Sequence, residues 1–107
     1  MKVYIEDRYG NRYNFRRLTR KETSEVLSLV TDKDSATVSA EKQFKEAFRI
    51  ANPNYNMDLF ESDILEYNFE EIGFVNLTKL MTMVLEEVFH TTGTNPSKYS
   101  FLEETQK

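Results

Sequence analysis

The chain has 107 residues, of which 39% are hydrophobic and 30% are charged, and its formal net charge is -4. This length and composition fit one domain with one modest core, and they exclude a disordered chain and a membrane protein. The chain contains no cysteine, which excludes disulfides, thiolate metal sites and a cysteine nucleophile. The acidic balance makes nucleic acid an unfavourable partner, because most faces would repel a phosphate backbone.

The N-terminal sequence and the hydropathy pattern predict the cellular compartment of the protein. The start, Met-Lys-Val-Tyr-Ile-Glu-Asp, reaches a charge too soon for a signal peptide. No apolar run approaches the roughly 20 residues that are needed to cross a bilayer. We therefore expect a cytoplasmic protein that does not contact a membrane.

Residues 2–17 are predicted to form a β-hairpin. Two segments rich in β-branched and aromatic residues, Val3–Ile5 and Tyr13–Phe15, flank Gly10 and Asn11, which both tolerate positive φ. Side-chain alternation lets each strand place its two outer hydrophobic residues on one face, so the pair can bury a single apolar side. An isolated hairpin is marginal in water, and we expect a helix to cover it.

Two helices are predicted next, over about 20–31 and 40–51. Thr19 and Glu22 have the spacing of a capping box, in which each side chain satisfies a backbone N–H at the start of a helix. The second helix shows apolar residues at steps of three and four, and an Asn-Pro-Asn sequence ends it. The intervening residues 32–39 are small and polar without periodicity, which indicates an exposed loop.

Two further helices are predicted over about 58–69 and 76–91, separated by Gly73. The last one has Asn76 as its expected N-cap and carries the longest apolar stripe in the chain, so we expect it to be the spine of the core. Residues 93–107 read as a C-terminal tail, with Gly and Pro following the helix.

The predicted fold is mainly α, with the N-terminal β-hairpin packed on a bundle of about four helices. It forms a single globular domain over residues 1–92. Basic residues are concentrated between positions 12 and 21 and acidic residues between 61 and 71. This asymmetry suits docking between like copies.

Few of the residue types that catalysis and ligand binding require are present. The three glycines are far apart and belong to no phosphate-cradling loop. His90 is the only histidine, which excludes a histidine pair for zinc, and we interpret it as a residue that favours the C-terminal end of a helix. The carboxylates between 61 and 71 fit a solvated helix face better than a calcium loop. We predict no catalytic, cofactor-binding or metal-binding residues, and a protein that is not an enzyme.

The residues predicted to bind a partner lie on three segments. The basic stretch after the hairpin fits an acidic protein partner, and stacking on nucleic acid and plain solvation remain its alternatives. Met83 falls off the apolar stripe of the last helix and indicates a second buried face, either within the fold or against another subunit. Aromatic residues in the tail are apolar enough to dock. The predicted set is Phe15, Arg16, Arg17, Arg20, Met83, Tyr99 and Phe101.

The order of these predicted elements resembles that of a known family of proteins. The hairpin is followed by Phe15-Arg16-Arg17-Leu18-Thr19-Arg20-Lys21-Glu22, then by Glu41-Lys42-Gln43-Phe44-Lys45-Glu46-Ala47 and by an apolar terminal helix. The Leu-Thr-Arg-Lys-Glu step contributes most of the likeness. In this pattern, residues 1 to 92 resemble the small tail assembly chaperones of tailed bacteriophages.

The resemblance implies a protein that coats the long, helical tape measure protein during tail assembly and helps to recruit tail tube subunits. Such a chaperone stays out of the finished particle, and it needs apolar grooves and self-association but no active site. The alternatives are a structural virion component, such as a baseplate or neck protein, and a small regulatory binding protein. A frameshift-extended form, which many such chaperones make, is not visible in this sequence.

Overall fold

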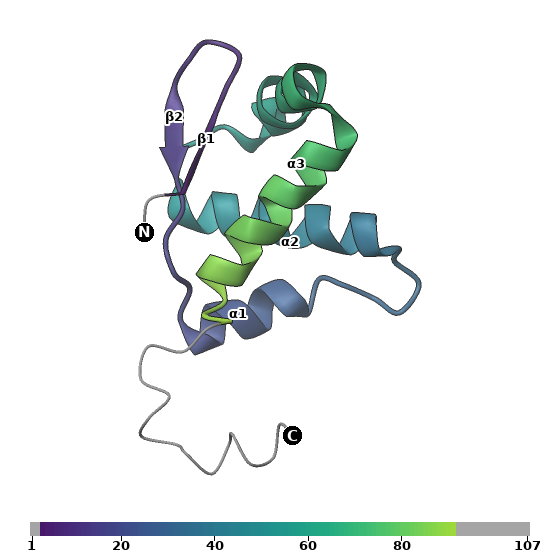
Figure 1. The fold of residues 1–107 in the computed structure, drawn as a ribbon. Coiled ribbons are helices and arrows are strands. Elements are labelled where there is room, and N and C mark those ends of the chain that lie inside the picture. The colour runs from purple at the N-terminus through teal and green to yellow at the C-terminus, as the bar shows by residue number, and fades with distance from the viewer. Residues whose placement is uncertain (1–2, 92–107) are drawn as a thin grey trace.

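The computed structural model describes residues 3–91, in which a hairpin leads into three α-helices (Figure 1). The elements are β1 (Tyr4–Glu6), β2 (Arg12–Asn14), α1 (Arg20–Leu27), α2 (Ala36–Ala51), the 3-10 helix η1 (Met57–Leu59), the π-helix η2 (Phe60–Glu66) and α3 (Tyr67–Val88). The predicted class, mainly α with a leading hairpin, is confirmed. The predicted number of about four helices is slightly wrong, because residues 57–66 form η1 and η2 and not a separate α-helix.

The hairpin is antiparallel and is closed by the carboxylate of Asp7. Ile5 lies opposite Tyr13 in the register of β1 and β2. Asp7 accepts hydrogen bonds from the backbone N–H groups of Tyr9 and Asn11, both at 2.9 Å, and from the Asn11 amide and the Tyr13 hydroxyl at 3.0 and 3.2 Å. Burial acts to raise the pKa of Asp7, but these donors together hold that pKa below its ordinary value. The hairpin turn is therefore held by one buried carboxylate whose two oxygens both accept hydrogen bonds.

The start of α1 has the predicted capping box. The Thr19 hydroxyl accepts from the Glu22 N–H at 3.2 Å, and the Glu22 carboxylate accepts from the Thr19 N–H at 2.9 Å. The Arg16 guanidinium donates two hydrogen bonds, of 2.9 and 2.8 Å, to the same carboxylate. These hydrogen bonds, with that of Arg16 the largest cause, lower the pKa of Glu22 to about 2. The helix ends at Leu27, earlier than the predicted residue 31.

Helix α2 begins at Ala36, four residues earlier than the predicted start near residue 40. Ser35 is the reason, because its hydroxyl accepts from the Val38 N–H at 3.2 Å and caps the helix. The loop between α1 and α2 therefore covers residues 28–35, which is the predicted length shifted by four residues toward the N-terminus. The predicted end of α2 near residue 51 is confirmed.

An aromatic cluster forms the centre of the core, between the hairpin, α2 and η2. Phe44, Phe48 and Phe60 have no exposed surface. The Phe48 ring lies 4.9 Å from that of Phe60 and 5.0 Å from that of Tyr55, both in edge-on geometry. Such aromatic pairs contribute about 0.5–1.5 kcal/mol beyond their buried area. The hairpin is therefore held to the helices through ring packing, with Tyr13 above Phe48 at 5.5 Å.

Helix α3 bends at Gly73, where φ is 82° and ψ is 168°. These angles are far from helical and are available almost only to glycine. The second half of α3 then crosses α2 and buries the predicted stripe, with Met81 only 1% exposed (Figure 1). Asn76 is not the N-cap, because it lies within α3 and its amide donates to the Ile72 carbonyl at 3.0 Å. The predicted interruption at Gly73 is confirmed, because its non-helical angles divide α3 into two helical segments, but residues 57–66 before them form η1 and η2.

The C-terminal end of α3 differs from its prediction. The helix ends at Val88 and not at residue 91, and His90 follows with a positive φ of 55°. The His90 N–H donates to the Glu87 carbonyl at 3.2 Å, so the backbone of this residue closes the last turn. The predicted tail, residues 93–107, lies outside the described residues. Within the described part of the chain, no helix is long and apolar enough to cross a membrane.

Candidate protein-docking site

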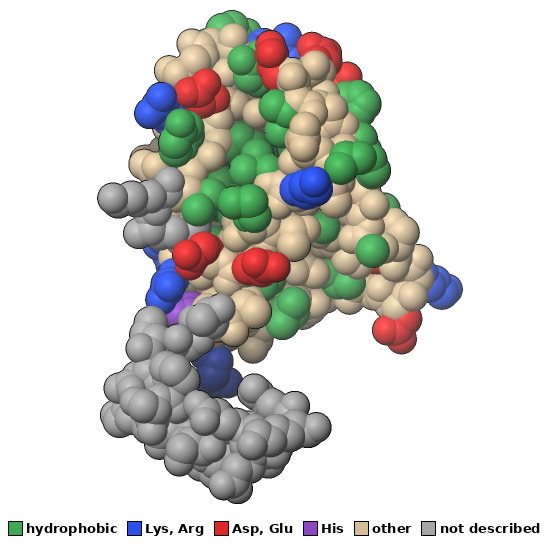
Figure 2. Space-filling view, in the orientation of Figure 1, with side chains coloured by type: hydrophobic (Ala, Val, Ile, Leu, Met, Phe, Trp, Pro, Cys, Tyr) green, Lys and Arg blue, Asp and Glu red, His purple; other side chains and the backbone are tan. Residues whose placement is uncertain are grey.

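Large hydrophobic side chains are exposed on both sides of Gly73, at the bend of α3. Phe69 is 43% exposed, Ile72 39%, Phe74 54% and Val75 65%. Figure 2 shows hydrophobic side chains along the edge of the molecule beside this bend. We call these four residues the bend patch. Single exposed hydrophobic residues are ordinary on protein surfaces, but a contiguous group marks an interaction site.

The bend patch continues into a small groove with an apolar floor and an acidic rim. The groove encloses about 80 Å³. Its apolar lining consists of Leu65, Phe69, Phe74, Leu77 and Met81, and its polar lining of Glu41, Glu61, Glu66 and Thr78. No lysine or arginine is among these lining residues. We call this feature the acidic groove.

The Thr78 hydroxyl lies in the wall of the acidic groove. Its oxygen is buried and has no hydrogen-bond partner among the residues that the structure describes. Leaving a buried polar group unsatisfied costs about 1–3 kcal/mol.

The sequence around Gly73 explains why the patch stays exposed. The second half of α3 buries its apolar residues at steps of three and four, namely Leu77, Met81, Val84, Leu85 and Val88. The Phe-Glu-Glu-Ile-Gly-Phe-Val segment before it holds more hydrophobic residues than one helix face can bury. Because Gly73 turns the chain there, the patch residues leave the buried stripe and face outward.

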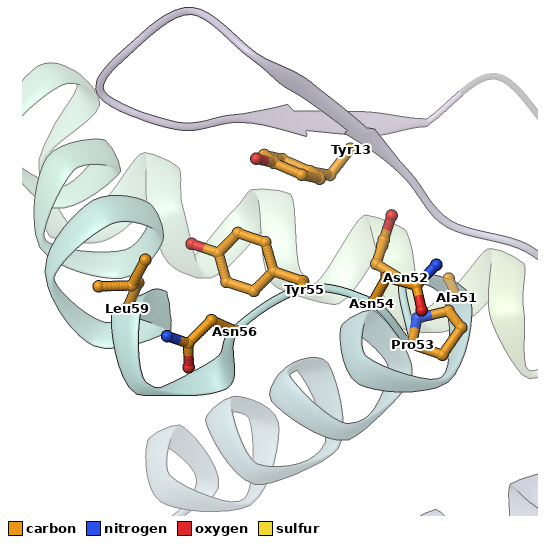
Figure 3. A pocket seen from close by; sticks show the side chains of 8 residues that line it. All are labelled: Tyr13, Ala51, Asn52, Pro53, Asn54, Tyr55, Asn56 and Leu59. Carbon is orange, nitrogen blue, oxygen red and sulfur yellow. The ribbon is translucent and has the colours of Figure 1, made fainter.

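A second pocket of about 560 Å³ lies between the hairpin and the connection from α2 to η1 (Figure 3). Two of its three asparagines hold the local backbone: the Asn52 amide donates to the Asn14 and Phe48 carbonyls, both at 3.1 Å, and Asn56 accepts from the Asp58 N–H at 3.1 Å. These side chains already have structural partners. The pocket therefore offers few groups that are available for a ligand.

Tyr55 stands in the middle of this pocket, with its hydroxyl pointing away from Asn52 and Asn54 (Figure 3). The hydroxyl is buried and has no hydrogen-bond partner among the described residues. Burial first, and then the nearby charge of Asp63, raise the pKa of Tyr55 to about 12. A phenol with this pKa stays protonated at neutral pH, so it cannot serve there as a general base.

The structure places the predicted partner-binding residues in different environments. The prediction for Phe15 needs correction, because its side chain is 3% exposed and packs 5.1 Å from the Phe44 ring. Arg16 is held by Glu22, whereas Arg20 is exposed at the start of α1. Arg17 forms an ion pair of 3.3 Å with Glu87 of α3.

Met83 is 58% exposed and lies one helical turn before Glu87. The ion pair with Glu87 thus brings Arg17 to the helix that carries Met83, although the two residues are far apart in the sequence. Met83 is not buried among residues 3–91, and its burial against another subunit stays a prediction. Tyr99 and Phe101 lie outside the described residues.

The bend patch was not among the sites predicted from the sequence. In the sequence, the patch corresponds to two hydrophobic residues on each side of Gly73. This number of hydrophobic residues is larger than one face of a helix can bury. The acidic residues near it were read as a solvated face, and Glu61 and Glu66 are indeed exposed. Their position on the rim of an apolar groove becomes visible only when η2 and α2 lie side by side.

Comparisons with known proteins add no further assignment. The chain matches no protein-family model, no curated protein and no solved structure. Among residues 3–91, no group of three or more His, Cys, Asp or Glu side chains is arranged to hold a metal ion. The surface chemistry of the described residues is therefore the basis for a functional proposal.

Proposed function

We propose that this protein is a non-enzymatic phage tail assembly chaperone that binds the tape measure protein and helps to recruit tail tube subunits. The observation that carries the proposal is the bend patch, in which four large hydrophobic side chains are 39–65% exposed beside a groove. The order of elements, a hairpin followed by the Leu18–Glu22 helix start, supplies the class of client through its resemblance.

The chemistry of the bend patch suits an amphipathic helix of the client. A helix that lays its apolar face in a groove is recognised through residues spaced by three and four, which match a patch of this kind. Burying one large hydrophobic side chain completely contributes about 1.5–3 kcal/mol. Part of this gain is lost to the cost of association, which keeps the binding reversible. Reversible binding is what a factor that leaves the finished particle needs.

Acidic residues accompany the bend patch and keep the unbound chain soluble. Glu70 and Glu71 lie between Phe69 and Ile72, and both are exposed. Charges next to an exposed apolar segment act against aggregation. The patch is therefore flanked by residues that favour the free state in solution without covering the hydrophobic side chains.

The proposal is tested by co-expressing the chain with the tape measure protein of the same genome and separating the products by gel filtration. The variant Phe69→Ala/Phe74→Ala removes two aromatic rings from the patch. The control is Tyr9→Ala, because Tyr9 is 73% exposed in the hairpin turn, away from the patch. We expect a complex with the wild type and the control and at least a tenfold weaker complex with the double variant.

A complex that is unaffected by the double variant would contradict the proposed site, and the absence of any complex with the wild type would contradict the proposed client. Mass spectrometry of purified particles tests the role in assembly. A chaperone is absent from the particles. Abundant copies in the particles would instead indicate the alternative, a structural virion component.

A further inference from the structure

A third pocket, of about 310 Å³, lies between α2 and the segments that follow α1 and α2 in the chain. Its apolar lining consists of Leu29, two residues after α1, and Met57 of η1. Leu29 is 44% exposed and Met57 is half-buried. The rest of the lining is one face of α2, because its residues recur at steps of three and four: Lys42, Lys45, Glu46 and Arg49. We call this feature the cationic pocket.

Three of the four charged residues that line the cationic pocket are cations. Lys42 forms an ion pair of 2.9 Å with Asp34, and Arg49 is paired with Glu46. Lys45 is exposed and forms no ion pair among residues 3–91. The pocket therefore combines an open apolar floor with an unpaired positive charge. This chemistry fits a segment that carries hydrophobic side chains beside carboxylates.

The C-terminal part of the same chain contains such a segment. Residues 101–104 read Phe-Leu-Glu-Glu, so two hydrophobic residues are followed directly by two carboxylates. The acidic groove at the bend would repel these carboxylates, because its charged lining residues are all glutamates. The pocket at Tyr55 has no charged lining residue. Charge therefore favours the cationic pocket over both of these sites.

The chain is long enough for residues 101–104 to reach the cationic pocket of the same molecule. The Leu18 N–H donates to the Val88 carbonyl at 2.9 Å, and Figure 1 shows the start of α1 beside the end of α3. Helix α1 is about 12 Å long at 1.5 Å per residue, and Leu29 follows two residues after its end. The ten residues from Thr91 to Phe101 can span up to about 33 Å. Their length therefore exceeds the length of α1 that separates the end of α3 from the pocket.

We propose that residues 101–104 dock in the cationic pocket of their own chain, with the Phe and Leu side chains on the apolar floor and the two carboxylates beside Lys45. A short linker gives an effective concentration on the order of 1 mM, so a contact with a dissociation constant of about 0.1 mM keeps about nine tenths of the molecules docked. The docked segment leaves the bend patch and the acidic groove uncovered. This inference therefore goes beyond the proposed function and does not depend on it.

A spin label beside the segment tests the contact in the full chain. Because the chain contains no cysteine, Thr105→Cys provides a single position for a nitroxide, which broadens the NMR signals of nearby amides. We expect the amide signals of Leu29 and Lys45 to lose most of their intensity, and those of Tyr9 and Val75 to keep theirs. Unchanged signals at Leu29 and Lys45, or equal broadening at Val75, would overturn the proposal.

A charge exchange identifies the groups that make the contact. Lys45→Glu/Arg49→Glu reverses the rim, and Glu103→Lys/Glu104→Lys reverses the segment. Each double variant replaces attraction by repulsion and should weaken docking about tenfold. Combining all four substitutions in one chain should restore the broadening.

The control for the charge exchange is Lys79→Glu, which changes an exposed lysine of α3 outside the cationic pocket and should leave the broadening unchanged. Circular dichroism establishes that each variant is folded before its signals are compared. Folded double variants that keep the broadening of the wild type, or a combined variant that does not recover it, would overturn the pairing of the segment with this rim.

A mixture of two samples separates docking within one chain from docking between copies. One sample is enriched in ¹⁵N and carries no nitroxide, and the other carries the nitroxide without ¹⁵N. We expect no broadening at Lys45 in the mixture, because each segment occupies the pocket of its own chain. Broadening in the mixture as strong as in the labelled chain would place the segment in the pocket of another copy and would overturn the intramolecular contact.

Discussion

The hairpin end of the molecule is closed by internal hydrogen bonds and ring packing, whereas the bend of α3 exposes large hydrophobic side chains. At the hairpin, the Asp7 carboxylate uses both oxygens to accept four hydrogen bonds, and the rings beneath it are packed against α2. At the bend, large hydrophobic side chains face outward and the Thr78 hydroxyl has no described partner. The first region is held by internal contacts and supports the fold, although the buried Tyr55 hydroxyl beside it also has no partner among the described residues. The second region exposes large hydrophobic side chains and is suited to a partner.

The largest expected effect comes from emptying the core beneath the hairpin. Phe48 has no exposed surface, and its ring contacts those of Tyr13, Tyr55 and Phe60. Phe48→Ala removes these contacts and leaves a cavity, so we expect the free energy of unfolding to fall by about 3–5 kcal/mol. Urea denaturation measures it. Tyr9→Ala is the control and changes stability by less than about 0.5 kcal/mol. A loss below about 1 kcal/mol for Phe48→Ala would contradict the assignment of this ring to the core.

The next effect concerns the polar closure of the hairpin. Asp7→Ala leaves the N–H groups of Tyr9 and Asn11 without their acceptor, which lowers the free energy of unfolding by about 1–3 kcal/mol at neutral pH. Because the folded pKa of Asp7 is lowered, its contribution is present above the ordinary carboxyl value of 3.8 and is lost as the pH falls below it. Denaturation at pH 7 and at pH 3 should therefore show a smaller difference between wild type and variant in acid. An equal difference at both pH values would count against the proposed role of the charge.

The two positive-φ glycines allow the regions to be compared by one substitution. Gly10 in the hairpin turn has a φ of 83° and Gly73 at the bend a φ of 82°, and neither has an atom within 4 Å of an added Cβ. Gly73→Ala forces a side chain into a backbone region that almost only glycine occupies, at a cost of about 1–3 kcal/mol. Gly10→Ala costs about 1 kcal/mol.

The two glycine substitutions should differ in their effect on client binding. Because Gly73 directs the bend patch outward, Gly73→Ala should weaken client binding as well as stability. Gly10→Ala should lower the melting temperature while client binding persists. Equal effects of the two substitutions on binding would remove Gly73 from the site.

The smallest effect on stability, and the most specific one, is expected at the patch itself. Phe74 is 54% exposed, so Phe74→Ala should change the free energy of unfolding by less than about 0.5 kcal/mol. The same substitution removes an aromatic ring from the groove and should weaken client binding several-fold. Urea denaturation and gel filtration with the tape measure protein measure the two effects side by side. A large loss of stability would instead assign Phe74 to the core.

The local signals in the sequence predicted the elements well where they act through neighbouring residues. The Thr19 and Glu22 spacing predicted the capping box, and the Asn-Pro-Asn segment predicted the end of α2. Ser35 shows the limit of this approach. A serine in a polar stretch reads equally as loop or cap, and only its hydrogen bond to the Val38 N–H decides the start of the helix.

The docking site was harder to predict because it depends on contacts between distant segments. Periodicity treats residues 58–69 as an α-helix, but η2 winds with a wider turn and changes which residues face the core. Gly73 was expected to separate two helices, and its actual φ and ψ determine where the neighbouring hydrophobic residues point. The acidic rim joins Glu41 with Glu61 and Glu66, which no local pattern relates.

The most direct test of the account is site-specific photo-crosslinking in the presence of the tape measure protein. A photoreactive residue is placed at Val75 in the bend patch or at Tyr9 in the hairpin turn, which are 65% and 73% exposed. Because both positions are open to solvent, exposure alone does not favour either. The account predicts a crosslink to the tape measure protein from position 75 and none from position 9. Crosslinking from position 9 alone, or equally from both positions, would contradict the claim that the bend of α3 is the docking site.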